Sequence, residues 1–341
     1  AHRAHDSWRR PALFPANVRD LGRIDALCGL CSLEVDHTRR SVSSWDCHSN
    51  CRRAFPALAH LCAKIARRMM ELKNISIKRG SQTIISSVDT RLEPGKIHVI
   101  IGPNGTGKTT LLRAMFGDLP LEAGQIVFND RTLSTGVHRS TRLRQWRDAI
   151  AYMPQDSMTD AALTVLEVVV LGRLDKLSLH IDDETLHQSM TRLEEAGIAH
   201  LADRNVTSLS GGQRQMTMFA QVLMREPKAM LLDEPVSALD LKHQVGLLDL
   251  VKREIQANNW VTVIVLHDLN LACQYADNLL VLSQSRLQLS GAPADIVTSD
   301  LILQAYGVDA EILRDRAGNP VIQPVAKKFE PALQNQERLV L

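Results

Sequence analysis

The alternation of apolar and polar positions predicts a group of short antiparallel strands that begins near residue 70. Residues 71–78 place apolar side chains between polar ones, which is typical of a half-buried strand. A second strand is expected at 83–92, before a turn that contains Pro94. Residues 124–133 indicate two more strands around Asn129, which favours a tight turn. Together these segments predict a small antiparallel β-layer.

Apolar runs predict a second sheet, with parallel strands. Runs of this kind lie at 97–101, 229–232 and 261–266. Because they are apolar at nearly every position, they suit strands that are covered on both faces. A last strand pair is expected from residue 278 onwards, and it ends at a turn at 291–293.

Helical spacing of apolar residues follows or separates these runs, so the expected fold class is α/β. Helices are expected at 109–116, 164–174, 182–196, 214–223 and 299–306. Asp182 or Asp183 is expected to cap the third of these helices, and Gly197 to end it. Past Pro324 the chain is polar, and residues 325–341 are expected to fray as a tail.

Composition and charge narrow the class of protein. Of 341 residues, 45% are hydrophobic and 23% charged, which is typical of a globular protein. The formal net charge is only +2, so the balance predicts neither nucleic acid nor an acidic membrane as a partner. No apolar run approaches the ~18 residues that a membrane span needs. If a membrane is involved, we expect another chain to cross it.

The first 68 residues differ from the rest. They hold eleven arginines, one lysine and six acids, together with five of the six cysteines. Because they lack a sustained period and precede Met69 and Met70, we expect residues 1–68 to be a non-native or disordered extension. A zinc module remains the alternative, with candidate ligands Cys28, Cys31, Cys47, Cys51, His37 and His48. The one cysteine of the main body suits a reducing compartment.

The loop after the run at 97–101 carries the first candidate chemistry. Gly102, Gly107, Lys108 and Thr109 fit the phosphate-binding pattern of Gly, four residues, Gly-Lys-Ser/Thr. Glycines let backbone N–H groups converge on phosphate oxygens, and the helix that follows points its N-terminus at the same anion. The candidate ATP-binding residues are Gly102, Pro103, Asn104, Gly105, Thr106, Gly107, Lys108, Thr109 and Thr110.

Two acids close the apolar run at 229–232. Ligands of open α/β sheets bind at the carboxyl ends of the strands, so Asp233 and Glu234 are placed for chemistry. Asp233 could hold Mg²⁺ together with Thr109, and Glu234 could polarise an attacking water. The alternative is a helix cap or a surface turn.

Ser210, Gly211, Gly212 and Gln213 begin the helix expected at 214–223. They form a second anion-binding helix start, although one such site is enough for the chain's own nucleotide. Here the sequence resembles the ATP-binding cassette (ABC) family, whose defining pentapeptide is residues 209–213. Further family motifs follow in order across 70–270, at the positions Gln155, Ser237, Asp240 and His267.

The resemblance implies a phosphate-loop NTPase core with a mostly parallel sheet, an antiparallel β-subdomain and an inserted helical subdomain at about 156–208. The ATP-binding domain would span 69–324. The resemblance also implies a head-to-tail homodimer, in which each ATP lies between one phosphate loop and the partner's Ser210–Gln213 and Asp240. It assigns catalysis to Glu234, His267 and Gln155, and Mg²⁺ to Thr109, Gln155 and Asp233.

One position departs from the family pattern. The aromatic residue that usually stacks on adenine is replaced by Arg79, whose guanidinium could stack on the base instead. His267 could also be a satisfied core histidine rather than a γ-phosphate contact.

Local matches at 168–173, 267–272 and 306–310 resemble the ATPases of ferric-siderophore, haem and cobalamin importers. The resemblance implies a peripheral subunit on the cytoplasmic face of the inner membrane, joined to polytopic permease subunits and, indirectly, to a substrate-binding protein. Ferric siderophore is the first choice of cargo, and haem or cobalamin the alternative. A soluble ATP-dependent switch acting on nucleic acid or a cytosolic complex is the rival, but it would need a basic face, and residues 69–341 hold 28 basic and 32 acidic residues.

Overall fold

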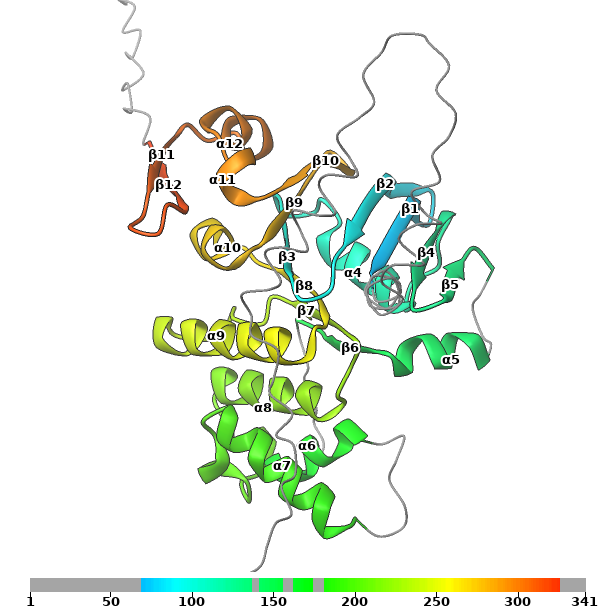
Figure 1. The fold of residues 1–341 in the computed structure, drawn as a ribbon, viewed down its shortest axis with the longest axis vertical. Helices are drawn as coiled ribbons and strands as arrows, with labels where there is room; N and C mark the ends of the chain where they lie inside the picture. Colours follow the sequence, from blue (N-terminus) through cyan, green and yellow to red (C-terminus); the bar gives the residue numbers. More distant parts are fainter. Residues whose placement is uncertain (1–68, 137–140, 156–161, 174–180, 326–341) are drawn as a thin grey trace, which may run out of the picture. The chain divides into compact units, whose positions relative to one another are not determined.

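The computed structural model describes residues 69–136, 141–155, 162–173 and 181–325 (Figure 1). The hypothesis on residues 1–68, and the expectation that the tail at 325–341 frays, therefore lie outside the described residues, apart from Val325.

The described elements include both strands and helices along the chain. The first part holds β1 (Met70–Arg79), β2 (Gln82–Leu92), β3 (Ile97–Ile101), α4 (Lys108–Phe116), β4 (Ala123–Phe128), β5 (Arg131–Ser134), α5 (Thr141–Asp148) and β6 (Ile150–Met153). The middle holds α6 (Val165–Val170), α7 (Asp183–Glu195), α8 (Gly211–Met224) and β7 (Ala229–Asp233). The last part holds α9 (Leu241–Asn258), β8 (Val261–Val265), α10 (Leu269–Tyr275), β9 (Asn278–Ser283), β10 (Arg286–Gly291), α11 (Pro293–Ile296), α12 (Ser299–Tyr306), β11 (Ala310–Arg314) and β12 (Pro320–Pro324).

The predicted parallel sheet is confirmed. Six strands pair in the order β10-β9-β3-β8-β7-β6. The five from β9 to β6 are parallel, and only β10 pairs antiparallel with its neighbour β9. Every residue of β3, β7 and β8 is buried, as their apolar runs predict. The carboxyl ends of these strands consequently lie side by side at one edge of the sheet.

The antiparallel β-layer is also confirmed, in the order β2-β1-β4-β5. Its first strand explains an irregular spacing in the sequence, because Leu72 and Ile75 are both buried although they are three residues apart. A register shift between them marks a bulge, in which Asn74 has a φ of 50°. The Asn74 N–H donates to Asp89 on β2 at 2.9 Å, so the bulge has its own partner.

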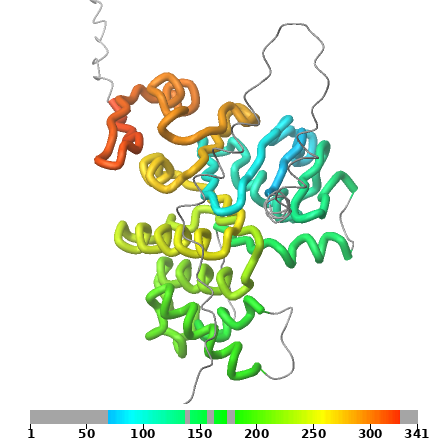
Figure 2. Tube along the Cα trace, viewed as in Figure 1, coloured from blue at the N-terminus to red at the C-terminus, as the bar shows by residue number. Residues whose placement is uncertain are grey.

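Helices α6, α7 and α8 pack against one another, and Figures 1 and 2 show them grouped together. Thr164 and Asp182 cap the first two by accepting from the N–H groups of Glu167 and Thr185. The helix expected at 164–174 changes to a 3-10 turn at Leu171–Arg173. A Cβ at Gly172 would lie 2.5 Å from the Gln221 carbonyl of α8, so this contact requires glycine.

The predicted ranges do not include several described elements, namely α5, β6, α9, α10, α11, β11 and β12. The pair β9–β10 is not the last, because β11 and β12 form a further hairpin whose turn is held by Asp315, which accepts from the Ala317 and Asn319 N–H groups at 2.8 Å each. Helix α5 is strongly polar and buries only Leu143 and Trp146. Both expose most of their side chains, so their apolar periodicity is weak. Within the described ranges, no helix has the length and apolarity that a bilayer span requires.

Candidate nucleotide-binding site

The phosphate loop joins the end of β3 to the start of α4. Gly102, Gly105 and Gly107 adopt φ values of 152°, 80° and 96°, a region that favours glycine. At Gly102 space is limiting as well, because a Cβ there would lie 2.1 Å from the Leu282 carbonyl of β9. The loop can therefore fold against the sheet only with glycine at this position.

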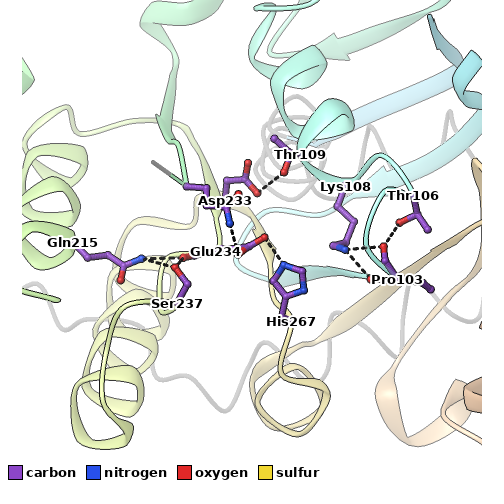
Figure 3. Close-up of polar contacts among 11 residues, drawn as sticks. Pro103, Thr106, Lys108, Thr109, Gln215, Asp233, Glu234, Ser237 and His267 are labelled. Carbon is purple, nitrogen blue, oxygen red and sulfur yellow. Dashed lines mark hydrogen bonds and ion pairs between the residues drawn. The ribbon is translucent and has the colours of Figure 1, made fainter. Parts of the chain in front are cut away.

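Lys108 lies inside this loop. Its Nζ donates to the carbonyl oxygens of Gly102 at 2.7 Å and Pro103 at 3.0 Å, which folds the side chain back over the loop (Figure 3). Only 6% of Lys108 is exposed, and burial lowers its pKa, while the charges of Glu234 and Asp233 oppose that shift. A buried ammonium held by neutral carbonyls gains further stabilisation from an anion such as a phosphate.

Asp233, at the end of β7, meets Thr109 across the sheet edge. The Thr109 hydroxyl donates to Asp233 Oδ1 at 3.1 Å. The other oxygen, Oδ2, is buried and has no hydrogen-bond partner among the described residues. Burial raises the pKa of this carboxyl. A buried carboxylate oxygen without a partner is costly, and hydroxyl and carboxylate oxygens are the ligands that Mg²⁺ prefers, so the pair fits this ion.

Glu234 lies between two other predicted residues. Its Oε2 accepts from Gln155 Nε2 at 2.7 Å, and its Oε1 is hydrogen-bonded to His267 Nε2. Gln155 follows β6 and His267 follows β8, the two neighbours of β7 in the sheet. The His267 side chain is 45% exposed, which contradicts the alternative of a core histidine. The three predicted catalytic residues thus meet at one point.

Ser210–Gln213 form a separate helix start. The Gln213 N–H donates to the Ser210 hydroxyl at 3.3 Å, and the Ser210 N–H donates to Gln213 Oε1 at 3.1 Å, a reciprocal capping box at the start of α8. Ser210 and Gly211 are exposed. Within the described part of the chain, no hydrogen bond joins these residues to the phosphate loop. The structure therefore does not bring the two predicted phosphate cradles together in one chain.

The remaining predicted residues lie around the site. Asp240 is exposed and caps α9 by accepting from the His243 N–H at 3.0 Å. Arg79 is exposed at the end of β1, opposite Gln82. Ile84 and Ile85, a little further along β2, lie against Gly107, so this hairpin borders the phosphate loop. Stacking of adenine on Arg79 stays a prediction.

Sequence reasoning missed Gln215, which is 8% exposed on α8. Its Nε2 donates to the Glu234 carbonyl at 2.9 Å, and its Oε1 accepts from the Ala238 N–H at 3.0 Å. The available signal was a glutamine among apolar residues on the buried face of a predicted helix. Such a residue requires buried hydrogen-bond partners.

The sequence of this chain is similar to those of known proteins. A family model described as ABC transporter matches residues 85–237. The chain is 37% identical over 246 residues to the hemin import ATP-binding protein HmuV of Hahella chejuensis, covering 70% of this chain and 93% of that protein. It is 34% identical over 261 residues to the ferric enterobactin transport ATP-binding protein FepC of Escherichia coli, covering 75% and 93%.

Solved structures are similar as well. An inward-facing ABC transporter assigned to the metal-chelate type aligns with a TM-score of 0.64 at 26% identity, over 76% of this chain and 98% of the other. A dimeric ATP-binding cassette in a post-hydrolysis state, bound to ADP and phosphate, aligns with a TM-score of 0.60 at 25% identity, over 65% and 98%.

Proposed function

Because this chain belongs to the ABC transporter family and is an ATPase, we propose that it energises an importer of an iron chelate. The import part of the proposal is supported by the similarity to the hemin and ferric enterobactin proteins. The hydrolysis part is supported by the Glu234 carboxylate, held between Gln155 and His267 at the carboxyl end of β7. A carboxylate so placed beside a phosphate loop can orient water toward a γ-phosphate.

Each residue then has a role in hydrolysis. Lys108 and the backbone N–H groups of residues 102 and 104–110 bind the β- and γ-phosphates. Glu234 takes a proton from the attacking water, and His267 contacts the γ-phosphate. Thr109, Asp233 and Gln155 would hold Mg²⁺, which when bound neutralises charge on the phosphate oxygens. Arg79 stacks on the base.

The second cradle takes part in trans. Ser210 and Gly211 are exposed at the start of α8, and within the described residues no hydrogen bond joins Ser210–Gln213 to the chain's own phosphate loop. In a head-to-tail homodimer they would bind the γ-phosphate of the ATP held by the other copy, with Asp240 at the seam. The dimeric cassette with ADP and phosphate among the similar structures supports this arrangement.

The importer consists of further chains. The ATP-binding domain at 69–324 would sit on the cytoplasmic face of the cell membrane and engage a polytopic permease through its helical subdomain, about 156–208. A substrate-binding protein would act indirectly. We propose a ferric siderophore as the cargo, supported by similarity to the ferric enterobactin protein. Haem is the second candidate, because similar proteins include a hemin import protein.

The test uses the full chain together with the polytopic permease that co-purifies with it. The complex is reconstituted in proteoliposomes, and ATP-driven uptake of iron-labelled siderophore and of haem is measured in parallel. Uptake of the siderophore alone supports the first cargo, and uptake of haem alone supports the second. Transport of neither, combined with co-purification of DNA or RNA in place of a permease, would overturn the importer proposal in favour of a soluble switch.

A further inference from the structure

The backbone at Glu234 has an unusual conformation. Its φ is 51°, in the left-handed region that residues other than glycine seldom adopt. Such a conformation persists only where the surroundings hold it in place. The Glu234 N–H donates to the Val265 carbonyl of β8 at 3.2 Å, which fixes one side of the residue. The other side, the Glu234 carbonyl, requires its own partners.

Gln215 is one of those partners. Its Nε2 donates to the Glu234 carbonyl at 2.9 Å, and the Ser237 hydroxyl donates to the same oxygen at 3.1 Å (Figure 3). The Ser237 N–H also donates to this oxygen, at 3.2 Å. Gln215 Oε1 accepts from the Ala238 N–H at 3.0 Å. Both ends of one buried amide are therefore used, so its orientation is fixed by Glu234 and by the loop at 234–239 together.

The same loop lies against the start of α8. A Cβ at Gly212 would be 3.1 Å from the Ala238 carbonyl, and one at Gly211 would be 3.5 Å from the Ala238 Cβ. The turn of α8 that holds the second phosphate cradle is thus packed on the loop that Gln215 links to Glu234. A displacement of this helix start is transmitted to the Glu234 backbone by a direct hydrogen bond.

We propose that Gln215 is a positioning residue that ties occupancy of the Ser210–Gln213 cradle to the placement of Glu234 in the same chain. This inference rests on the proposed function, in which that cradle binds the partner's ATP while Glu234 acts on the chain's own. Gln215 then couples the two ATP sites of the dimer. Hydrolysis at one site depends on nucleotide at the other, and the dependence passes through one amide.

Gln244 offers a matched comparison. From α9 its Nε2 donates to the carbonyls of Leu239 at 3.0 Å and Val236 at 3.3 Å, so it holds the same loop. No hydrogen bond within the described ranges joins Gln244 to Glu234. A role limited to stabilising the loop would make the two glutamines equivalent. A positioning role makes only Gln215 matter for the rate.

The experiment compares Gln215→Met and Gln244→Met, which keep side-chain volume and remove the hydrogen bonds. ATPase rate against MgATP concentration is measured for the full chain in its permease complex, and binding of a fluorescent ATP analogue is measured separately. For Gln215→Met we expect kcat to fall by ~10- to 100-fold, because a small misplacement of a catalytic group is costly. KM is expected to stay within about twofold, since the phosphate loop is unchanged, and the Hill coefficient to fall toward 1. For Gln244→Met, kcat and cooperativity are expected within about twofold of the parent.

Equal losses in the two variants, or an unchanged kcat and Hill coefficient in Gln215→Met, would overturn the inference. If Gln215→Met fails to fold, Gln215→Glu takes its place, because it keeps the acceptor for Ala238 and loses the donor to Glu234. Unaltered cooperativity in that variant would also overturn it. If the parental protein neither dimerises nor hydrolyses ATP, the proposed function itself is wrong. If the parent and the Gln215 variant both hydrolyse ATP with equal cooperativity, only the role of Gln215 is wrong.

Discussion

The two phosphate cradles of this chain differ in how much of a binding site each contains. The loop at 102–109 surrounds a buried lysine and joins Thr109 to a buried aspartate, so charge, N–H donors and a metal-binding pair are all present. The helix start at 210–213 has only neutral donors, and each of its two polar side chains accepts a hydrogen bond from the backbone N–H of the other residue. It is exposed to solvent.

The difference shows which cradle can act alone. Charge-assisted hydrogen bonds to phosphate are roughly twice as strong as neutral ones, and burial strengthens them further. The first cradle can therefore hold a nucleotide in a monomer. The second adds a helix N-terminus, whose effect on an exposed anion is small. The second cradle is therefore expected to contribute to phosphate binding when another surface already holds the phosphate beside it.

Glu234→Gln tests the reaction that requires both cradles, which is the hydrolysis of the ATP held between them. Losing the general base is expected to lower kcat by ~10²- to 10⁴-fold while MgATP still binds. The loaded protein should accumulate as a dimer, as measured by light scattering beside the steady-state rate. Glu226→Gln, which alters the exposed partner of an ion pair with Arg173, is the control and should keep the parental rate. A Glu234→Gln protein that hydrolyses at the parental rate contradicts the assignment.

Lys108→Ala removes the cation from the first cradle only. Loss of a charged hydrogen bond of about 1.5–3 kcal/mol is expected to weaken MgATP binding to the monomer by ~10- to 100-fold. Isothermal titration under monomeric conditions measures it. Lys228→Ala changes an exposed lysine and should bind as the parent does. Equal affinities in the two variants would refute the view that the first cradle is complete by itself.

Ser210→Ala acts on the second cradle. Monomer affinity for MgATP should not change, whereas loss of the cap at about 1 kcal/mol, near fivefold, is expected to weaken ATP-dependent dimerisation. Sedimentation with the Glu234→Gln background measures the dimer. Thr298→Ala removes the equivalent cap of α12 and should leave dimerisation intact. The comparison fails if Ser210→Ala weakens nucleotide binding in the monomer.

A rise to alkaline pH is expected to affect the first cradle, which contains Lys108, and not the second, which has only neutral donors. Burial lowers the pKa of Lys108, so the folded chain releases this proton before the unfolded chain does. The associated stability is present above the unfolded pKa of about 10.4 and is lost as pH falls through the folded value. Urea unfolding at stepped pH should show this dependence, and Lys108→Met should remove it. MgATP affinity is expected to fall over the same rise in pH, because the charge disappears; an affinity that stays flat would contradict this.

Much of this fold follows from local sequence. The buried runs that became β3, β7 and β8 needed no tertiary information, because a strand that is apolar at nearly every position is typically covered on both faces. The hairpin β11–β12 was missed because its strands are short and half exposed. It is held in part by Asn270 of α10, whose Oδ1 accepts from the Ile322 N–H at 2.8 Å, a contact between residues 52 positions apart.

The candidate site divides in the same way. Gly102, Lys108 and Thr109 are near neighbours in the chain, and their chemistry depends on spacing, so the sequence by itself determined the phosphate loop. Gln155 and His267 lie 79 and 33 positions from Glu234, and only the pairing of β6, β7 and β8 in one parallel sheet brought them to its carboxylate. The contacts of Gln215 could not be predicted from the sequence, because its partners are backbone groups. Since backbone carbonyls are the same in every sequence, only the tertiary structure shows which one Gln215 contacts. A loop's chemistry is local, whereas the partner of a buried amide is settled only when the helices pack.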